Sequence, residues 1–157
     1  MFRVAIVAAL EREVRPLVKG WRVSEKEYGE RRFKFYENEN VVAVCGGIGA
    51  EAARRAAEAV IALHGPEVIY SVGFAGALDP GLKVGDLIRP QRVVNAADGS
   101  SVSLNVGEGV LVSFGSVASP EQKAKLREAY AAQAVDMEAS AVARAAEARG
   151  IQFGVVK

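Results

Sequence analysis

The order of apolar and polar positions along the chain predicts strands that alternate with helices. Nearly continuous apolar runs are typical of strands covered on both faces, and they occupy residues 2–9, 41–45, 68–72, 134–136 and 151–156. Polar or alanine-rich stretches of helical character lie between them, at residues 11–19, 50–63, 120–130 and 138–149. We therefore expect an α/β fold with a mainly parallel sheet covered on both faces.

The segments between these runs add smaller elements. Residues 21–37 interleave aromatic and charged side chains around Gly29-Glu30, which predicts an antiparallel hairpin of two half-exposed strands. Ser119 and Pro120 are suited to the N-cap and the first position of the helix that follows them. Shorter strands are expected at residues 87–94, 102–104 and 110–114, with Pro90 at an edge or a bulge.

Length and charge limit the classes of protein that fit. With 157 residues, half of them apolar, the chain is long enough for one domain, which we expect to span residues 1–157. The 20 basic and 19 acidic residues nearly balance, so nothing in the charge favours nucleic acid as a partner. The first apolar run reaches Glu11 too soon for a membrane or signal segment. We expect a cytoplasmic protein without a membrane partner.

The single cysteine and the single histidine offer little chemistry. Cys45 has no second cysteine to pair with, and His64 has no Cys or His neighbour that would complete a metal site. Lone residues of these types are more often structural than functional. We expect both to be structural, without a metal site.

The candidate chemistry centres on Ala134 to Ala139, where Asp136 and Glu138 flank Met137. If a strand ends at Asp136 and a helix begins at Glu138, the Glu138 carboxylate lies near backbone N–H groups at a helix N-terminus. It could then accept hydrogen bonds from sugar hydroxyls. Ordinary helix N-terminal charges are an equally good interpretation of this pattern alone. Ligands of such sheets bind outside the carboxyl ends of the strands, which selects residues 9–13, 45–49, 73–76 and 136–138.

A glycine motif offers a different function. Residues 47–52, GIGAEA, match the G-x-G-x-x-A form of the dinucleotide fingerprint, and they follow a strand and open a helix. That fingerprint requires an acid at the end of the next strand, but the nearest acid, Glu67, precedes it. We therefore favour a tight turn that brings helix and sheet close together over an NAD-dependent oxidoreductase.

Taken together, these segments resemble the purine nucleoside phosphorylase and uridine phosphorylase superfamily. The resemblance runs nearly end to end and is strongest to its hydrolytic branch, the methylthioadenosine/S-adenosylhomocysteine nucleosidases. It rests on AALEREV at residues 8–14, GIG at 47–49, VGFAG at 72–76 with LKVGD at 82–86, and AVDMEA at 134–139. It implies a Rossmann-like three-layer α/β/α sandwich with a mixed, mostly parallel sheet, which cleaves the N-glycosidic bond of a purine nucleoside without a cofactor, as a homodimer.

The resemblance also implies roles for individual residues. Glu13 would activate water, and Met137 and Glu138 would hold the ribose. The oxocarbenium-like sugar of the transition state suits both carboxylates. The residues that it implies for substrate binding are Ala9, Phe74, Ala75, Gly76, Val117, Asp136, Met137 and Glu138, with Glu13 and Glu138 catalytic. Of these, Asp136 is better explained as structural, and Val117, with Ser116, is the nearest candidate for the base.

The sequence departs from the family pattern in three places. Phe74 stands where a small hydroxyl residue is usual, and the loop at residues 10–13, LERE, is acidic, so hydrolysis is favoured over phosphorolysis. The stretch 95–119 is short for a base-binding region. In the family the last strand continues past a basic residue, here Lys157, to an aspartate that protonates the purine and to a final helix. The sequence has neither, so we expect impaired catalysis and uncovered apolar surface.

Several functions therefore stay open. Features of residues 74 and 135–138 also resemble hopanoid-associated phosphorylases and futalosine hydrolases, so the nucleoside need not be methylthioadenosine. A non-catalytic nucleoside-binding module is the alternative from a different class.

Overall fold

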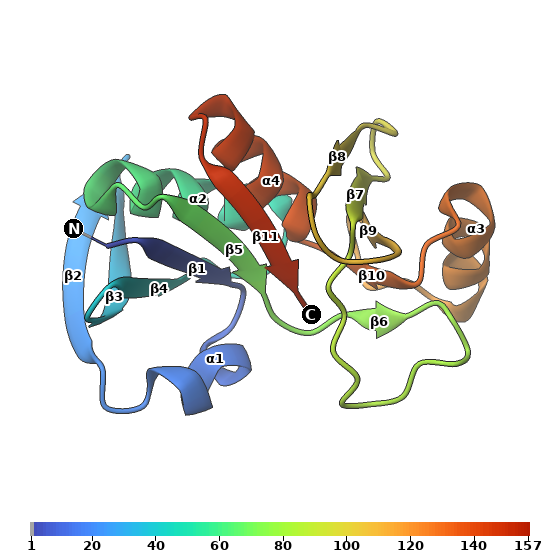
Figure 1. The fold of residues 1–157 in the computed structure, drawn as a ribbon, viewed down its shortest axis with the longest axis horizontal. Coiled ribbons are helices and arrows are strands. Elements are labelled where there is room, and N and C mark those ends of the chain that lie inside the picture. Colours follow the sequence, from blue (N-terminus) through green and yellow to red (C-terminus); the bar gives the residue numbers. More distant parts are fainter. Residues whose placement is uncertain (1) are drawn as a thin grey trace.

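The computed structural model describes residues 2–157, which form two sheets that share a boundary (Figure 1). The larger sheet has the strand order β11-β5-β1-β4-β3-β2. Its strands are β1 (Val4–Ala8), β2 (Arg22–Tyr28), β3 (Arg31–Asn38), β4 (Val41–Cys45), β5 (Val68–Val72) and β11 (Gln152–Val156). Strands β11, β5, β1 and β4 are parallel, and the predicted hairpin β2–β3 joins them antiparallel through β4.

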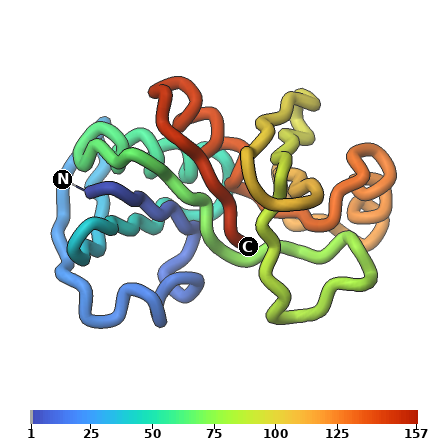
Figure 2. Tube along the Cα trace, in the orientation of Figure 1, coloured from blue at the N-terminus to red at the C-terminus, as the bar shows by residue number. Residues whose placement is uncertain are grey.

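The second sheet has the order β6-β10-β9-β7-β8. Its strands are β6 (Gly76–Ala77), β7 (Arg92–Asn95), β8 (Ser101–Ser103), β9 (Val110–Ser113) and β10 (Ala134–Asp136). Strands β7, β9 and β10 are parallel, whereas β6 and β8 are antiparallel additions at the edges. The tube in Figure 2 shows the chain leaving the larger sheet after β5 and returning to it through the helix at Ala139–Ala148 and strand β11.

Four helices complete the described chain: α1 (Glu11–Val18), α2 (Ala50–His64), α3 (Pro120–Tyr130) and α4 (Ala139–Ala148). Helix α2 contacts α4, and both lie along one face of the larger sheet (Figure 1). Helix α4 also contacts strands of the second sheet, so it spans the boundary. The Ser119 hydroxyl accepts the Gln122 N–H at 3.2 Å and caps α3, as predicted.

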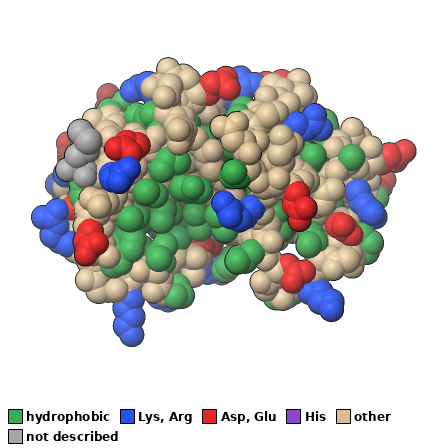
Figure 3. Space-filling view, viewed as in Figure 1, with side chains coloured by type: hydrophobic (Ala, Val, Ile, Leu, Met, Phe, Trp, Pro, Cys, Tyr) green, Lys and Arg blue, Asp and Glu red, His purple; other side chains and the backbone are tan. Residues whose placement is uncertain are grey.

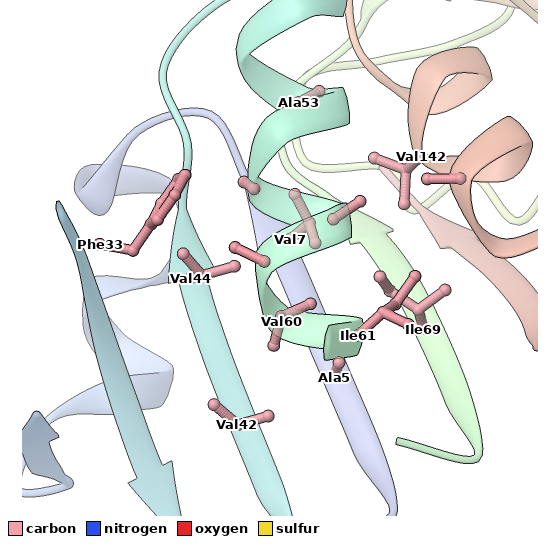
Figure 4. Packing of buried hydrophobic residues seen from close by; sticks show 14 of the residues in the cluster. Ala5, Val7, Phe33, Val42, Val44, Ala53, Val60, Ile61, Ile69 and Val142 are labelled. Atoms are coloured by element: carbon pink, nitrogen blue, oxygen red, sulfur yellow. The ribbon is translucent and has the colours of Figure 1, made fainter. Parts of the chain in front are cut away.

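The core lies between α2 and the larger sheet. Small alanines on α2, such as Ala53, let the helix approach branched side chains of β1, β4 and β5, including Val7, Val44 and Ile69 (Figure 4). A Cβ at Gly46 would lie 2.6 Å from that of Ala56 and 2.8 Å from the Ala52 carbonyl oxygen. Close helix–sheet packing therefore requires a glycine at position 46, directly before the GIGAEA motif, whereas Gly47 and Gly49 adopt positive φ angles of 105° and 98° in the turn.

The opposite face of the larger sheet is covered in part by α1. Val14 and Val18 of α1 pack there with Ile6 and Ala8, whereas apolar side chains around them remain partly exposed. These are Val4, Trp21, Val41, Cys45 and Val72. Figure 3 shows hydrophobic side chains gathered over this face. Within residues 2–157, no helix is both long and apolar enough to cross a membrane.

His64 and Cys45 occupy packed positions. His64 Nε2 lies 3.1 Å from the buried Glu37 carboxylate, which also pairs with Arg22 and accepts a hydrogen bond from Ser24 Oγ at 2.9 Å. Burial lowers the pKa of His64 despite Glu37. Burial also raises the pKa of the Cys45 thiol to about 11, with smaller contributions from nearby acids. A thiol with this pKa is a poor nucleophile at neutral pH.

The structure differs from the expected fold in two details. One mainly parallel sheet was expected, but the strands divide into two sheets. The strand expected at 87–94 is confined to Arg92–Asn95. Leu87 is 79% exposed, so its apolar side chain does not mark a buried strand, and Ile88 exchanges backbone hydrogen bonds only with Lys157.

Candidate active site

A cavity of about 310 Å³ is lined by residues that follow the carboxyl ends of β1 and β5 and by residues of β6 and β10 of the second sheet. This is the edge at which parallel sheets bind their ligands. All the residues expected at the site line this one cavity: Ala9, Glu13, Phe74, Ala75, Gly76, Val117, Asp136, Met137 and Glu138. The structure thus brings together segments that are far apart in the sequence.

Glu13 is held by backbone N–H groups from two segments. It occupies the first turn of α1, and its Oε1 accepts the N–H of Leu10 at 2.7 Å. Its Oε2 accepts the N–H of Phe74, also at 2.7 Å. A Cβ at Gly73 would overlap this carboxylate, so a larger residue there would displace it from its present position. Each carboxylate oxygen retains a further lone pair that a water molecule could approach.

Glu138 is also held by a distant segment. We expected Glu138 in the first turn of its own helix, but it is the N-cap of α4, and its Oε2 accepts the N–H of Gly49 at 2.8 Å. Gly49 is the N-cap of α2, so the carboxylate lies at the N-terminus of a different helix. Burial raises the pKa of Glu138 above its ordinary value; Asp136 and Glu13 also raise it, whereas the Gly49 N–H lowers it.

This contact also bears on the dinucleotide hypothesis. In that fingerprint the helix N-terminus after the glycine turn binds a pyrophosphate. Here the N–H of Gly49 is directed at the Glu138 carboxylate. A pyrophosphate at the same place would meet this negative charge, which favours the packing interpretation of the motif.

Asp136 lines the cavity, but both of its carboxylate oxygens have partners within the chain. Oδ1 accepts the Ser113 hydroxyl at 2.6 Å, and Oδ2 accepts the Ala139 N–H at 2.8 Å. Oδ2 also pairs with Lys157 Nζ at 3.2 Å, in a setting where both side chains are almost completely buried. The Ser113 hydroxyl in turn accepts the Ser140 N–H at 3.0 Å. These bonds fix the backbone on both sides of Met137 and Glu138.

Apolar side chains form most of the remaining cavity wall. Phe74 is 66% exposed and Val117 is 86% exposed, so both present hydrophobic surface at the cavity mouth. A larger cavity of about 670 Å³ adjoins the first and shares Glu13, Phe74 and Ala75 with it. The turn at residues 82–86, which belongs to the family resemblance, lines this second cavity.

Sequence reasoning missed several cavity residues. Arg12, Ile48, Ala118, Lys123 and Val135 also line the first cavity. Arg12 and Ile48 adjoin expected residues, so proximity in sequence could have found them. Lys123 lies on the polar helix α3, where a lysine resembles any surface residue, and only the tertiary fold, which brings its side chain beside Gly76 of β6, places it here.

The model of a family described as the phosphorylase superfamily matches residues 3–115 and 96–157 of this chain. The chain belongs to the phosphorylase superfamily. This membership agrees with the resemblance seen in the four sequence segments.

Individual superfamily members resemble the chain over nearly its whole length. A 5′-methylthioadenosine/S-adenosylhomocysteine nucleosidase of Staphylococcus aureus is 28% identical, in an alignment that covers 98% of this chain and 84% of the relative. The structure of the Helicobacter pylori 5′-methylthioadenosine/S-adenosyl homocysteine nucleosidase has a TM-score of 0.86 at 22% identity, covering 99% and 83% of the two chains. The futalosine hydrolase of the same species has a TM-score of 0.85 at 23% identity, with the same coverage. The α/β sandwich predicted from the sequence is therefore confirmed.

No metal centre stands out in residues 2–157, where His, Cys, Asp and Glu side chains form no group of three or more that could hold an ion. The cavity instead combines two carboxylates held by backbone N–H groups with apolar walls. Such an arrangement suits an uncharged ligand that has a polar, hydroxyl-bearing part and a flat apolar part.

Proposed function

We propose that this protein hydrolyses the N-glycosidic bond of a purine nucleoside of the methylthioadenosine/S-adenosylhomocysteine kind. One observation carries the proposal: Glu13 and Glu138 line a single cavity at the strand ends, and each carboxylate is oriented by an N–H group from a distant segment. The similarity to the nucleosidase of Staphylococcus aureus supports the same reaction.

In this mechanism Glu138 accepts hydrogen bonds from the ribose hydroxyls. As the bond between C1′ and the base nitrogen breaks, its electron pair leaves with the base, and the sugar becomes positively charged. The hydrogen bonds to Glu138 then strengthen, which lowers the barrier because they are stronger in the transition state than in the ground state. Because the carboxylate is buried, few water molecules compete with the ribose hydroxyls for its hydrogen bonds.

Glu13 acts as the general base in the same step. A water molecule beside its carboxylate attacks C1′, and Glu13 takes the proton that the water loses. The two N–H groups from Leu10 and Phe74 hold the carboxylate in place for this transfer. The departing base, which holds the electron pair, takes up a proton from solvent, and the products are the free base and the free sugar.

Water is a better nucleophile than phosphate for this cavity. A phosphate ion beside C1′ would meet the Glu13 and Glu138 carboxylates, which the exposed Arg12 side chain would offset only in part, and the Phe74 side chain has no group to bind its oxygens. Two related activities are alternatives: a futalosine hydrolase-like activity, supported by the structural similarity, and a hopanoid-associated phosphorylase activity, supported by the resemblance at residues 135–138. A nucleoside-binding module without turnover is the third.

We further infer a homodimer in the cytoplasm. The support is the resemblance to the nucleosidases and the partly exposed apolar surface of the larger sheet. Light scattering coupled to size exclusion would give the oligomeric state directly, and a mass of one chain, about 16.6 kDa, would contradict the dimer.

The decisive experiment compares Glu13→Gln with Glu11→Gln. Both acids lie in the first turn of α1, but only Glu13 lines the cavity. Base release from purine nucleosides should fall by about 10²–10⁴-fold in Glu13→Gln, because the general base is lost, and stay near wild type in Glu11→Gln. Equal rates in both variants would remove Glu13 from the mechanism. Release of no base by the wild type, with nucleoside binding intact, would instead support the binding module.

A further inference from the structure

Lys123 is a cation on the α3 side of the cavity, whereas the two carboxylates enter it from α1 and from the start of α4. Glu13 and Glu138 enter from α1 and from the start of α4, beside the larger sheet. The α3 side of the cavity is formed by Gly76 of β6, by Val117 and Ala118 before α3, and by Lys123 of α3. With the sugar at the carboxylates, a base attached to it can extend toward the α3 side of the same cavity.

The position of Lys123 is well defined. Ser119 caps α3, and the first helical hydrogen bond joins the Lys123 N–H to the Ser119 carbonyl oxygen at 2.8 Å. The side chain reaches across β6, since a Cβ placed on Gly76 would lie 3.4 Å from Lys123 Nζ and 3.5 Å from its Cε. Gly76 lacks that atom and leaves room for the lysine and for a ligand.

The charge of Lys123 is not matched by a neighbouring acid. Among the ion pairs of residues 2–157, Asp136 pairs with Lys157, and no carboxylate pairs with Lys123. The other basic side chain that lines the cavity, Arg12, is exposed and comes from α1, as Glu13 does. An unpaired ammonium beside apolar walls attracts an anion or a strong hydrogen-bond acceptor.

Cleavage creates such a group on this side of the cavity. The electron pair of the broken bond stays on the base, whose ring nitrogens then share a negative charge. We propose that Lys123 is a catalytic residue that stabilises the leaving purine base through its ammonium group. This inference rests on the nucleosidase function proposed above. The interaction develops with the charge, so it acts on the transition state more than on the bound substrate.

The proposal is tested with substrates whose bases need this charge to different extents. A purine nucleoside methylated at N7 already carries a positive charge on the base, which therefore leaves as a neutral molecule. Lys123→Met should reduce kcat for unmethylated nucleosides by about 10²–10³-fold, with KM little changed. The same variant should hydrolyse 7-methylguanosine or 7-methylinosine as fast as wild type or faster, since it lacks a cation that repels their base.

Two further variants separate charge from structure. Lys123→Arg keeps a cation and should retain much of the activity on unmethylated nucleosides. Lys125→Met removes a lysine of the same helix that does not line the cavity, and it should behave as wild type on both substrates. An equal loss by Lys123→Met on methylated and unmethylated nucleosides, at an unchanged thermal unfolding midpoint, would overturn the role of Lys123. Release of no base from either substrate by the wild type would overturn the proposed function, and the role of Lys123 with it.

Discussion

Replacing Asp136 by asparagine should destabilise the protein strongly, because it breaks the buried ion pair with Lys157. The two charged atoms are 3.2 Å apart, and the side chains of Lys157 and Asp136 are 2% and 0% exposed. At an effective dielectric constant of about 20, two charges at this separation attract each other by about 5 kcal/mol. The cost of removing both charges from water offsets much of this attraction in the intact pair.

The variant keeps the cost of burying the lysine and loses the attraction. An amide in place of the carboxylate leaves the Lys157 ammonium buried without a counter-charge, so the free energy of unfolding should fall by about 3–5 kcal/mol. Urea denaturation, followed by the fluorescence of Trp21, the single tryptophan, measures this difference. Combining Asp136→Asn with Lys157→Met should recover much of the loss, since no unpaired charge then remains buried.

Asp98→Asn is the matched control. Asp98 also forms an ion pair, at 2.8 Å from Arg144, but both side chains are about half exposed and water screens the pair. Asp98→Asn should therefore lower the free energy of unfolding much less than Asp136→Asn does. If Asp136→Asn and Asp98→Asn lowered the free energy of unfolding equally, burial of the Asp136–Lys157 pair would not have the energetic consequence argued from its geometry.

Two further predictions concern packing and titration. Gly154→Ala should destabilise the protein by about 1–3 kcal/mol in the same urea assay, because its Cβ would overlap the Tyr70 ring, whereas Gly115→Ala, where a Cβ meets open space, should not. The acid limb of kcat/KM should lie above the ordinary pKa of a glutamate, because burial raises the pKa of Glu138 and ribose binding needs the carboxylate. The same ionisation has the opposite effect on stability. Because the pKa of Glu138 is higher in the folded than in the unfolded protein, its contribution to stability is lost as the pH rises from the unfolded-state pKa through the folded-state pKa. An acid limb that stayed in place in Glu138→Gln would assign it to another group.

The sequence was sufficient to predict strands that are buried along their length and helices whose ends carry capping residues. Strands β1 and β4 are apolar throughout because helices or neighbouring strands cover them, so the apolar run marks the strand. Ser119 marks the start of α3 through its own hydrogen bond. The prediction of a strand before Arg92 was wrong because Leu87 is apolar and yet exposed, so an apolar residue there does not indicate a buried strand.

The division into two sheets could not be predicted from the same pattern. Strands of both sheets have similar apolar runs, and their membership depends on hydrogen-bond partners that are distant in sequence. Helix α4 is apolar enough to contact both sheets, which a single sequence does not reveal.

Part of the candidate site could be predicted from the sequence. The rule that ligands bind at the carboxyl ends of parallel strands, together with the family resemblance, selected segments that line one cavity. It could not supply the partners of each carboxylate. Glu138 was expected to use its own helix and instead uses Gly49, while Lys123 and Lys157 enter the site region only through tertiary packing.

The hydrogen bonds that hold the two carboxylates also set the time at which binding can begin. Glu13 and Phe74 are 61 positions apart, and Gly49 and Glu138 are 89 positions apart. Contacts of such long range form late and slowly in folding, because a large loop must close before they stabilise the chain. On the ribosome, Gly49 emerges long before Glu138 does. A nucleoside can therefore bind only after both ends of the chain have folded together, so ligand affinity should appear after secondary structure during refolding.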